Sequence, residues 1–139
     1  MRLYEVALSI AMKAHRGQVD KAGVDYINHP IYVASLVTSE NAKIVALLHD
    51  VIEDSAYTLA DLKNNGFTEE IIEAVSILTK SKNVSYEDYL KKVKENSLAR
   101  EVKLADLQHN TDLSRLSKIS ACDLKRVEKY RKAIEFLSN

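Results

Sequence analysis

The chain has 139 residues, of which 46% are hydrophobic and 29% charged, with 20 basic and 20 acidic side chains. This composition excludes disordered and fibrous classes, because it supplies both a core and a charged surface. The balanced charge argues against a general binder of nucleic-acid polymers, which would present a basic face. The single cysteine, Cys122, excludes an internal disulfide and a cysteine-clustered zinc site, and we expect it to be inert packing.

The domain organisation and location are inferred from two kinds of segment that the sequence lacks, linkers and long apolar runs. No Gly/Pro/Ser-rich stretch divides it, so we expect one domain over residues 1–139. No apolar run approaches the roughly 20 residues that cross a bilayer, and the start carries no apolar signal core. We therefore expect a cytoplasmic protein with no membrane partner, and the sequence leaves the oligomeric state open.

Helical hydrophobic spacing recurs along the chain. The first sixteen or so residues predict an amphipathic helix, and the stretch GQVDKAGVDYINHP then predicts a structured loop. Pro30 disfavours the α conformation for His29, which would place that histidine at the mouth of the next helix. Further helices are expected over 31–37, 42–52, 59–64, 67–78, 85–96, 97–116 and 120–137. Because no strand alternation accompanies these patterns, we predict a compact all-α bundle of about eight helices.

The stretch ALLHDVIEDS ends an apolar helix in polar side chains. On a continuous helix His49 and Glu53 lie four residues apart, as do Asp50 and Asp54, so all four would share one region of the surface. The apolar residues before them favour a cleft, where neighbouring acids repel unless a cation or a shared proton intervenes. The alternative is an exposed helix cap or a satisfied core histidine.

Two more residues extend this group into a candidate metal site. His29 and Asp106 would complete a set of two imidazoles and two carboxylates, which suits Mn²⁺, Fe²⁺ or another first-row divalent ion with open positions for water and substrate. In VKLADLQHN, Asp106 and Asn110 lie four apart on one helix face, so one could bind metal and the other substrate. The alternative is a surface acid followed by a turn-forming asparagine.

Three stretches, AHRGQVDKAGVDYINHP, LLHDVIED and VKLADLQHN, occur in this order. Together they resemble the HD-domain hydrolases related to the hydrolase half of RelA/SpoT proteins and to the stand-alone small alarmone hydrolases, over essentially the whole chain. The resemblance implies an HD-domain bundle that removes the 3′ pyrophosphate from guanosine tetra- or pentaphosphate. Since the chain contains only the hydrolase-like region, we expect one-way hydrolysis.

The resemblance also implies residue roles. It assigns one Mn²⁺ to His29, His49, Asp50 and Asp106, the handling of the attacking water to Glu53 and Asp54, and a place near the nucleotide sugar to Asn110. A divalent ion lowers the pKa of bound water, and a positioned carboxylate can shuttle its proton, so these roles agree with elementary chemistry.

One position departs from the family pattern. The family's RKSG segment, whose arginine packs on guanine, corresponds here to Asp20, Lys21, Ala22 and Gly23. Asp20 cannot stack as a guanidinium does, and its charge opposes a phosphorylated ligand. Two alternatives therefore stay open: an HD phosphohydrolase acting on a different nucleotide, and a non-catalytic nucleotide-binding module.

Two residues are candidates for substrate binding outside the motifs' core. Lys21 could pair with a phosphate, although a lone loop lysine is commonly a solvated charge. Tyr86, with nearby lysines, could form a base-stacking rim, although tyrosine is commonly half-buried core.

We expect a structural role for His15, which could brace the loop before His29. His109 points about 100 degrees away from Asn110 on a helix, so we expect it to be exposed.

Overall fold

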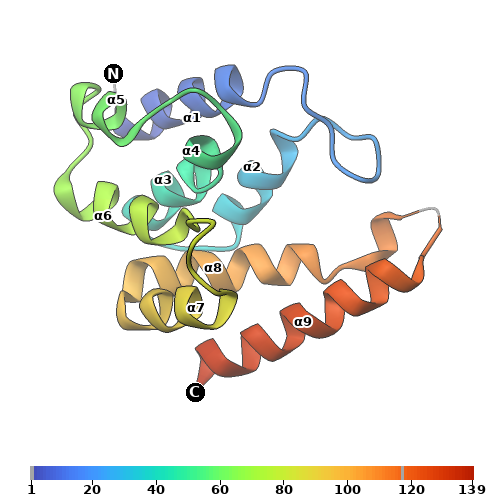
Figure 1. The fold of residues 1–139 in the computed structure, drawn as a ribbon. Helices are drawn as coiled ribbons and strands as arrows, with labels where there is room; N and C mark the ends of the chain where they lie inside the picture. Colours follow the sequence, from blue (N-terminus) through green and yellow to red (C-terminus); the bar gives the residue numbers. More distant parts are fainter. Residues whose placement is uncertain (1, 117) are drawn as a thin grey trace.

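The computed structural model describes residues 2–116 and 118–139, and helices account for its regular structure (Figure 1). The elements are α1 (Leu3–Ala14), α2 (Asn28–Ser35), α3 (Glu40–Leu48), α4 (Val51–Asp54), α5 (Leu59–Asn64), α6 (Glu69–Leu78), α7 (Tyr86–Glu95), α8 (Ser97–Asn110), the 3-10 turn Leu113–Arg115 and α9 (Ala121–Ser138). The predicted all-α class is confirmed.

The short helix α3 forms the centre of the bundle. Five of its consecutive residues are at most 2% exposed: Ile44, Val45, Ala46, Leu47 and Leu48. A helix that is apolar on all sides must be covered on all sides, and α1, α2, α6 and α8 pack around it. The residues that follow α3 are thereby delivered to the interior of the bundle rather than to its surface.

Side-chain caps set where several helices begin. Ser39 accepts a hydrogen bond from the amide of Ala42 at the start of α3, and Ser85 does the same for Asp88 at the start of α7. Capping boxes open α5 at Thr58 and α9 at Ser120. Each cap satisfies an amide that has no partner within the helix, so the local sequence determines where these helices start.

The beginning of α2 differs from the prediction. The helix starts at Asn28, three residues before the predicted start at Ile31, so that His29 lies inside its first turn. Pro30 is tolerated there because the amides of a first helical turn have no partner within the helix, and proline lacks only such an amide. His29 is therefore held by helical backbone rather than by a loop.

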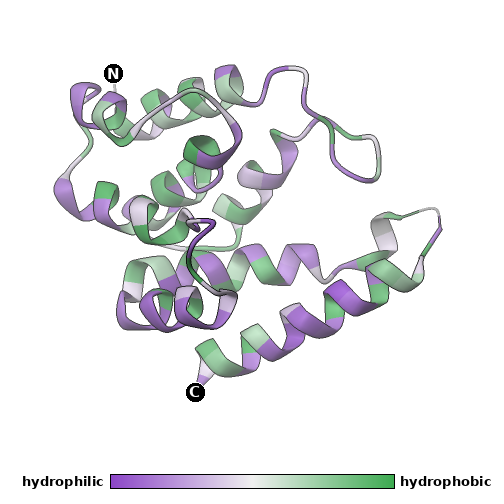
Figure 2. Cartoon of the chain, viewed as in Figure 1, coloured by the Kyte–Doolittle hydropathy of each residue, from purple (hydrophilic) through white to green (hydrophobic). Residues whose placement is uncertain are grey.

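The C-terminal helix α9 lies along α7 and α8 and is rich in hydrophilic residues (Figure 2). Cys122, in its first turn, is exposed, so the expectation that it packs in the interior is wrong. It lies five residues before the first buried apolar residue of this helix, Val127, where little of α9 is covered. Within residues 2–116 and 118–139, no helix combines the length and apolarity that a bilayer span requires.

Candidate metal centre

Two histidines and two aspartates meet at one point between α2, α8 and the turn that joins α3 to α4. His29 Nε2 lies 2.8 Å from Asp106 Oδ1. His49 Nε2 lies 3.3 Å from the same oxygen and 3.1 Å from Asp50 Oδ2. One ligand atom from each of the four residues lies within 4.8 Å of all the others. The structure therefore brings together all four predicted metal ligands.

The helix predicted over 42–52 is broken at this site, which corrects the geometry expected for its polar residues. α3 ends at Leu48, and α4 starts only at Val51. The His49 side chain explains the break, since its Nδ1 lies 2.5 Å from the Ala46 carbonyl, the acceptor that the Asp50 amide would use in an unbroken helix. A carbonyl can only accept, so Nδ1 donates and Nε2 is the nitrogen that faces the cluster. Burial opposes the charged form of His49, but Asp50 and Asp106 outweigh it and hold the His49 pKa well above its ordinary value. A ligated cation would replace that charge and take the Nε2 lone pair of the neutral ring.

Asp50 is oriented by Tyr26, a residue of the loop before α2. The hydroxyl of Tyr26 donates a 2.5 Å hydrogen bond to Asp50 Oδ2, and the His15 ring contacts the Tyr26 ring with centroids 4.9 Å apart and planes tilted by 52 degrees. Burial opposes ionisation of Asp50, but the neighbouring His49 outweighs it and lowers the pKa of this carboxyl to about 2. His15 Nδ1 also donates a 2.9 Å hydrogen bond to Gln18 Oε1 in the loop before α2, so His15 contacts the loop that it was expected to brace.

Asp106 directs one oxygen into the cluster and the other toward Lys103. Oδ2 lies 3.0 Å from Lys103 Nζ, while Oδ1 faces the histidines and accepts a 3.2 Å hydrogen bond from Asn110 Nδ2. Burial opposes ionisation of Asp106, but Lys103 and the histidine hydrogen bonds hold its pKa well below the ordinary value. Sequence reasoning missed Lys103, although its spacing of three residues before Asp106 was a signal for an ion pair on α8.

His109 is also part of the site, and the prediction that it is exposed is wrong. Only 7% of its surface is exposed. Its Nδ1 lies 2.7 Å from Nδ1 of His29, and its ring stacks on Tyr32 with centroids 4.3 Å apart. The reason is that α2 packs along α8 and covers this side of the helix. The missed signal is that His109 lies three residues after Asp106, on the same side of α8.

Glu53 and Asp54 lie in α4 at the rim of the site, outside the four-residue cluster, and both are partly exposed. Partial burial raises the pKa of both carboxyls above their ordinary values. Glu53 is held in place by the backbone amide of Lys80, which donates a 2.6 Å hydrogen bond to its Oε1. Their role in handling the attacking water stays a prediction.

A cavity of about 310 Å³ lies beside the cluster, between the loop before α2, the end of α8 with the segment that follows it, and the first half of α9. Two predicted substrate-binding residues, Lys21 and Asn110, line it, and so does the departing residue Asp20. Tyr26, Arg126 and Tyr130 also line it, and sequence reasoning did not single them out. The cavity combines apolar walls, aromatic rings and convergent polar groups, as small-molecule sites do.

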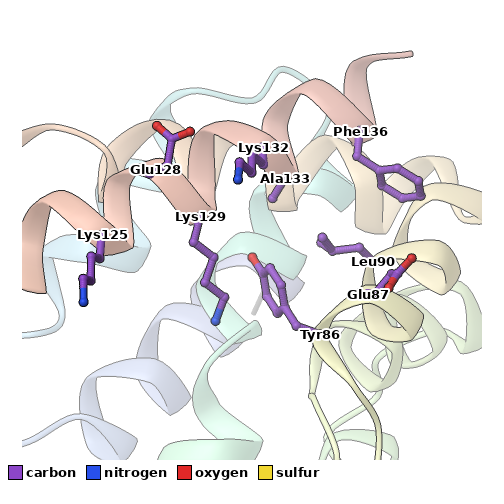
Figure 3. Close-up of a pocket in the computed structure, with 9 residues that line it drawn as sticks. All are labelled: Tyr86, Glu87, Leu90, Lys125, Glu128, Lys129, Lys132, Ala133 and Phe136. Atoms are coloured by element: carbon purple, nitrogen blue, oxygen red, sulfur yellow. The ribbon is translucent and has the colours of Figure 1, made fainter.

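Tyr86 lies elsewhere, in a pocket of about 620 Å³ between α7 and α9. Figure 3 shows its ring opposite Lys129 of α9, and the Lys129 ammonium lies 4.1 Å from the ring centroid. Leu90, Ala133 and Phe136 supply the apolar part of this pocket. The structure thus separates Tyr86 from the cavity that holds Lys21 and Asn110, and its role in substrate binding stays a prediction.

Several curated proteins are similar to this chain over most of its length. The guanosine-3′,5′-bis(diphosphate) 3′-pyrophosphohydrolase of Haemophilus influenzae is 38% identical over 117 residues, which are 73% of this chain and 17% of that protein. The bifunctional (p)ppGpp synthase/hydrolase SpoT of Escherichia coli K12 is 33% identical over 118 residues, 75% of this chain and 17% of that protein. The chain therefore spans about a sixth of the length of these relatives.

Solved structures and family membership give the wider context. A metazoan ortholog of SpoT, described as hydrolysing ppGpp, superposes with a TM-score of 0.80 at 24% identity, over 99% of this chain and 85% of that one, and so shares the fold. The family model described as the HD domain matches residues 7–132. That range contains all four residues of the buried cluster and the helices that deliver them, and this chain belongs to the HD domain family.

Proposed function

We propose that this chain is a manganese-dependent phosphohydrolase, a single domain over residues 1–139, that removes the 3′ pyrophosphate from guanosine tetra- or pentaphosphate. The observation that carries the proposal is the gathering of His29, His49, Asp50 and Asp106 with ligand atoms within 4.8 Å of one another. The named hydrolase activity of the bacterial relatives supports the choice of reaction and substrate. A cytoplasmic location, as expected from the sequence, is part of the same proposal.

The cluster fits a divalent ion by the chemistry of its donors. Two imidazoles, which are neutral when they ligate, and two carboxylates, one buried and one partly buried, form the mixed nitrogen and oxygen set that first-row divalent metals prefer. Two carboxylates this close to one another repel, so a cation is the partner that this arrangement favours. A divalent ion held by these residues supplies Lewis-acid chemistry, since it polarises a phosphoryl oxygen and lowers the pKa of water.

The reaction consumes one water. Its oxygen attacks the phosphorus bound to the ribose 3′ oxygen, the bond between that phosphorus and the 3′ oxygen breaks, and the products are pyrophosphate and GDP or GTP. Glu53 has one oxygen committed to the Lys80 amide, so its Oε2 can take the proton of the attacking water. Asp54, the next residue of α4, is the second acid available for this transfer. Their raised pKa values make both carboxylates stronger bases than an ordinary glutamate or aspartate.

The cavity beside the cluster would hold the nucleoside part of the substrate. Asn110 lies at the boundary between the two, because its Nδ2 donates to Asp106 while its side chain lines the cavity. Lys21 and Arg126 line the same cavity and supply positive charge for phosphate oxygens. Lys21 Nζ lies 4.0 Å from Asp123 Oδ1 and is 63% exposed, so this weak ion pair leaves it able to meet a ligand.

A second candidate keeps the reaction and changes the nucleotide. Asp20 lines the cavity where the family's arginine packs on guanine, which favours a substrate with another base or fewer phosphates.

Turnover of the manganese-loaded protein tests both candidates. Guanosine tetraphosphate and a panel of other nucleotides would be incubated with it, and pyrophosphate and phosphate release would be measured separately. Release of pyrophosphate with GDP, abolished in Asp106→Ala, is the expected result. Turnover of another nucleotide alone would establish the second candidate, and no turnover of any nucleotide by metal-loaded protein would refute both.

A further inference from the structure

The His29 ring makes a contact through each of its nitrogens. Nε2 lies 2.8 Å from Asp106 Oδ1, inside the cluster, and Nδ1 lies 2.7 Å from His109 Nδ1, on the opposite side of the ring. A hydrogen bond between two imidazole nitrogens needs one proton, so one Nδ1 atom donates and the other accepts. The identity of the donor decides whether His29 can present a lone pair to a metal.

Metal ligation determines the direction of this hydrogen bond. A ligating Nε2 carries no proton, so neutral His29 must carry its proton on Nδ1 and donate it to His109. His109 must then accept at Nδ1 and carry its own proton on Nε2. The two rings are therefore required to adopt opposite tautomers. His49 needs no histidine partner, because its Nδ1 donates its proton to the Ala46 carbonyl.

The position of His109 is determined by the two helices that also supply metal ligands. α8 carries both Asp106 and His109, and α2 carries both His29 and Tyr32. The Tyr32 ring covers His109 with centroids 4.3 Å apart, and the planes of the His29 and His109 rings differ by 12 degrees. The Tyr32 ring thus holds His109 beside the His29 ring, with their Nδ1 atoms facing each other.

We propose that His109 is a positioning residue of the metal site, which accepts the Nδ1 proton of His29 and thereby holds Nε2 of His29 in its ligating tautomer. The inference rests on the metal site of the proposed function. Loss of such an outer hydrogen bond to a ligating histidine typically weakens metal affinity by about 10- to 100-fold. His109 itself contributes no ligand atom to the cluster.

The Mn²⁺ affinity of two variants tests the proposal, with equilibrium dialysis as the readout. His109→Phe retains an aromatic ring under Tyr32 but removes the acceptor, so its dissociation constant should rise about 10- to 100-fold. His109→Asn places an oxygen near the position of Nδ1, so it should restore affinity to within about threefold of the wild type. Gln108→Ala, exposed on the same helix, is the matched control and should bind as the wild type does.

Three outcomes are informative. Wild-type affinity in His109→Phe would overturn the inference, as would equal weakening in the phenylalanine and asparagine variants, since the acceptor would then be irrelevant. A wild-type protein that binds no divalent ion would instead refute the metal site of the proposed function.

If His109→Phe does not fold, nitrogen NMR of the zinc-loaded wild type decides the matter. The inference requires a proton on Nε2 of His109 and none on its Nδ1. The opposite tautomer would contradict it.

Discussion

Lys103 Nζ lies 3.0 Å from Asp106 Oδ2, on the side of the carboxylate away from the oxygen that faces His29 and His49. Both side chains of this pair are largely covered, with 14% and 6% exposed. Burial opposes the charged form of Lys103, but Asp106 outweighs it and raises the lysine pKa above its ordinary value. A permanent positive charge therefore lies next to the candidate metal site, inside the bundle.

Lys103→Met should destabilise the metal-free protein. Removing one partner of a buried ion pair leaves an uncompensated charge, so the free energy of unfolding should fall by about 3 kcal/mol. Urea denaturation in the presence of a chelator measures this loss. Lys91→Met is the control, because the exposed Lys91–Asp88 pair at 3.8 Å should contribute less than about 1 kcal/mol. Added Mn²⁺ should restore part of the stability of Lys103→Met by neutralising Asp106, and equal losses in the two variants would contradict this account.

His49→Ala and Asp106→Ala should lose bound metal together with turnover. Each removes one member of the four-residue cluster, and first-row metals bind poorly when a ligand is missing from such a set. The metal content of the purified protein, measured by elemental analysis, should fall from about one equivalent to a small fraction of one. Asp88→Asn, on an exposed face of α7, should keep both metal and turnover. A full metal complement in either alanine variant would remove that residue from the ligand set.

Glu53→Gln should retain the metal and slow hydrolysis. The amide oxygen of glutamine can still accept the hydrogen bond from the Lys80 amide, so the change removes the base while keeping the contact. Loss of a positioned acid or base typically costs about 10²- to 10⁴-fold in rate. Single-turnover rates and metal content, measured on the same samples, check the prediction. An unchanged rate would exclude Glu53 from proton transfer.

The acid side of the pH–rate profile should report Glu53. Burial raises its pKa above the ordinary value of 4.5, and the carboxylate is the form that accepts a proton. The rate should therefore fall as the pH decreases through this raised pKa, at a higher pH than for an ordinary glutamate. Glu53→Gln should lose that limb while keeping its low residual rate. Metal content must be followed at each pH, and an identical acid limb in the variant would assign it to another group.

Asp20→Asn should improve binding of a phosphorylated substrate. Asp20 Oδ1 accepts hydrogen bonds from the amides of Ala22 and Val24 at 2.8 and 3.0 Å, so the acid closes the turn at this end of the cavity. Asparagine can keep these bonds while removing a negative charge, and KM for an anionic nucleotide should fall roughly two- to threefold at low salt. Asp20→Ala removes both bonds and should raise KM instead. A higher KM in Asp20→Asn would show that the charge itself favours binding.

Much of the fold could be predicted from local sequence because its causes are local. The apolar run before His49 required a buried helix, and the helices predicted to start at 59 and 120 begin at Leu59 and Ala121. The same applies to the choice of ligand types, since two histidines and two aspartates in ordered motifs suggest a mixed metal site. These inferences needed only periodicity and donor chemistry.

The tertiary structure decided how these residues act together. His29 and Asp106, which lie 77 residues apart in the chain, approach to 2.8 Å because α2 packs along α8. The same packing covers His109 with the Tyr32 ring of α2; the spacing from Asp106 indicates the side of α8 on which His109 lies, but not this partner. The packing of α7 against α9 places Tyr86 in a separate pocket, away from Lys21 and Asn110. Local sequence thus determined which helices form and which groups could bind a metal, whereas partners, burial and hydrogen-bond direction depend on contacts between helices distant in the chain.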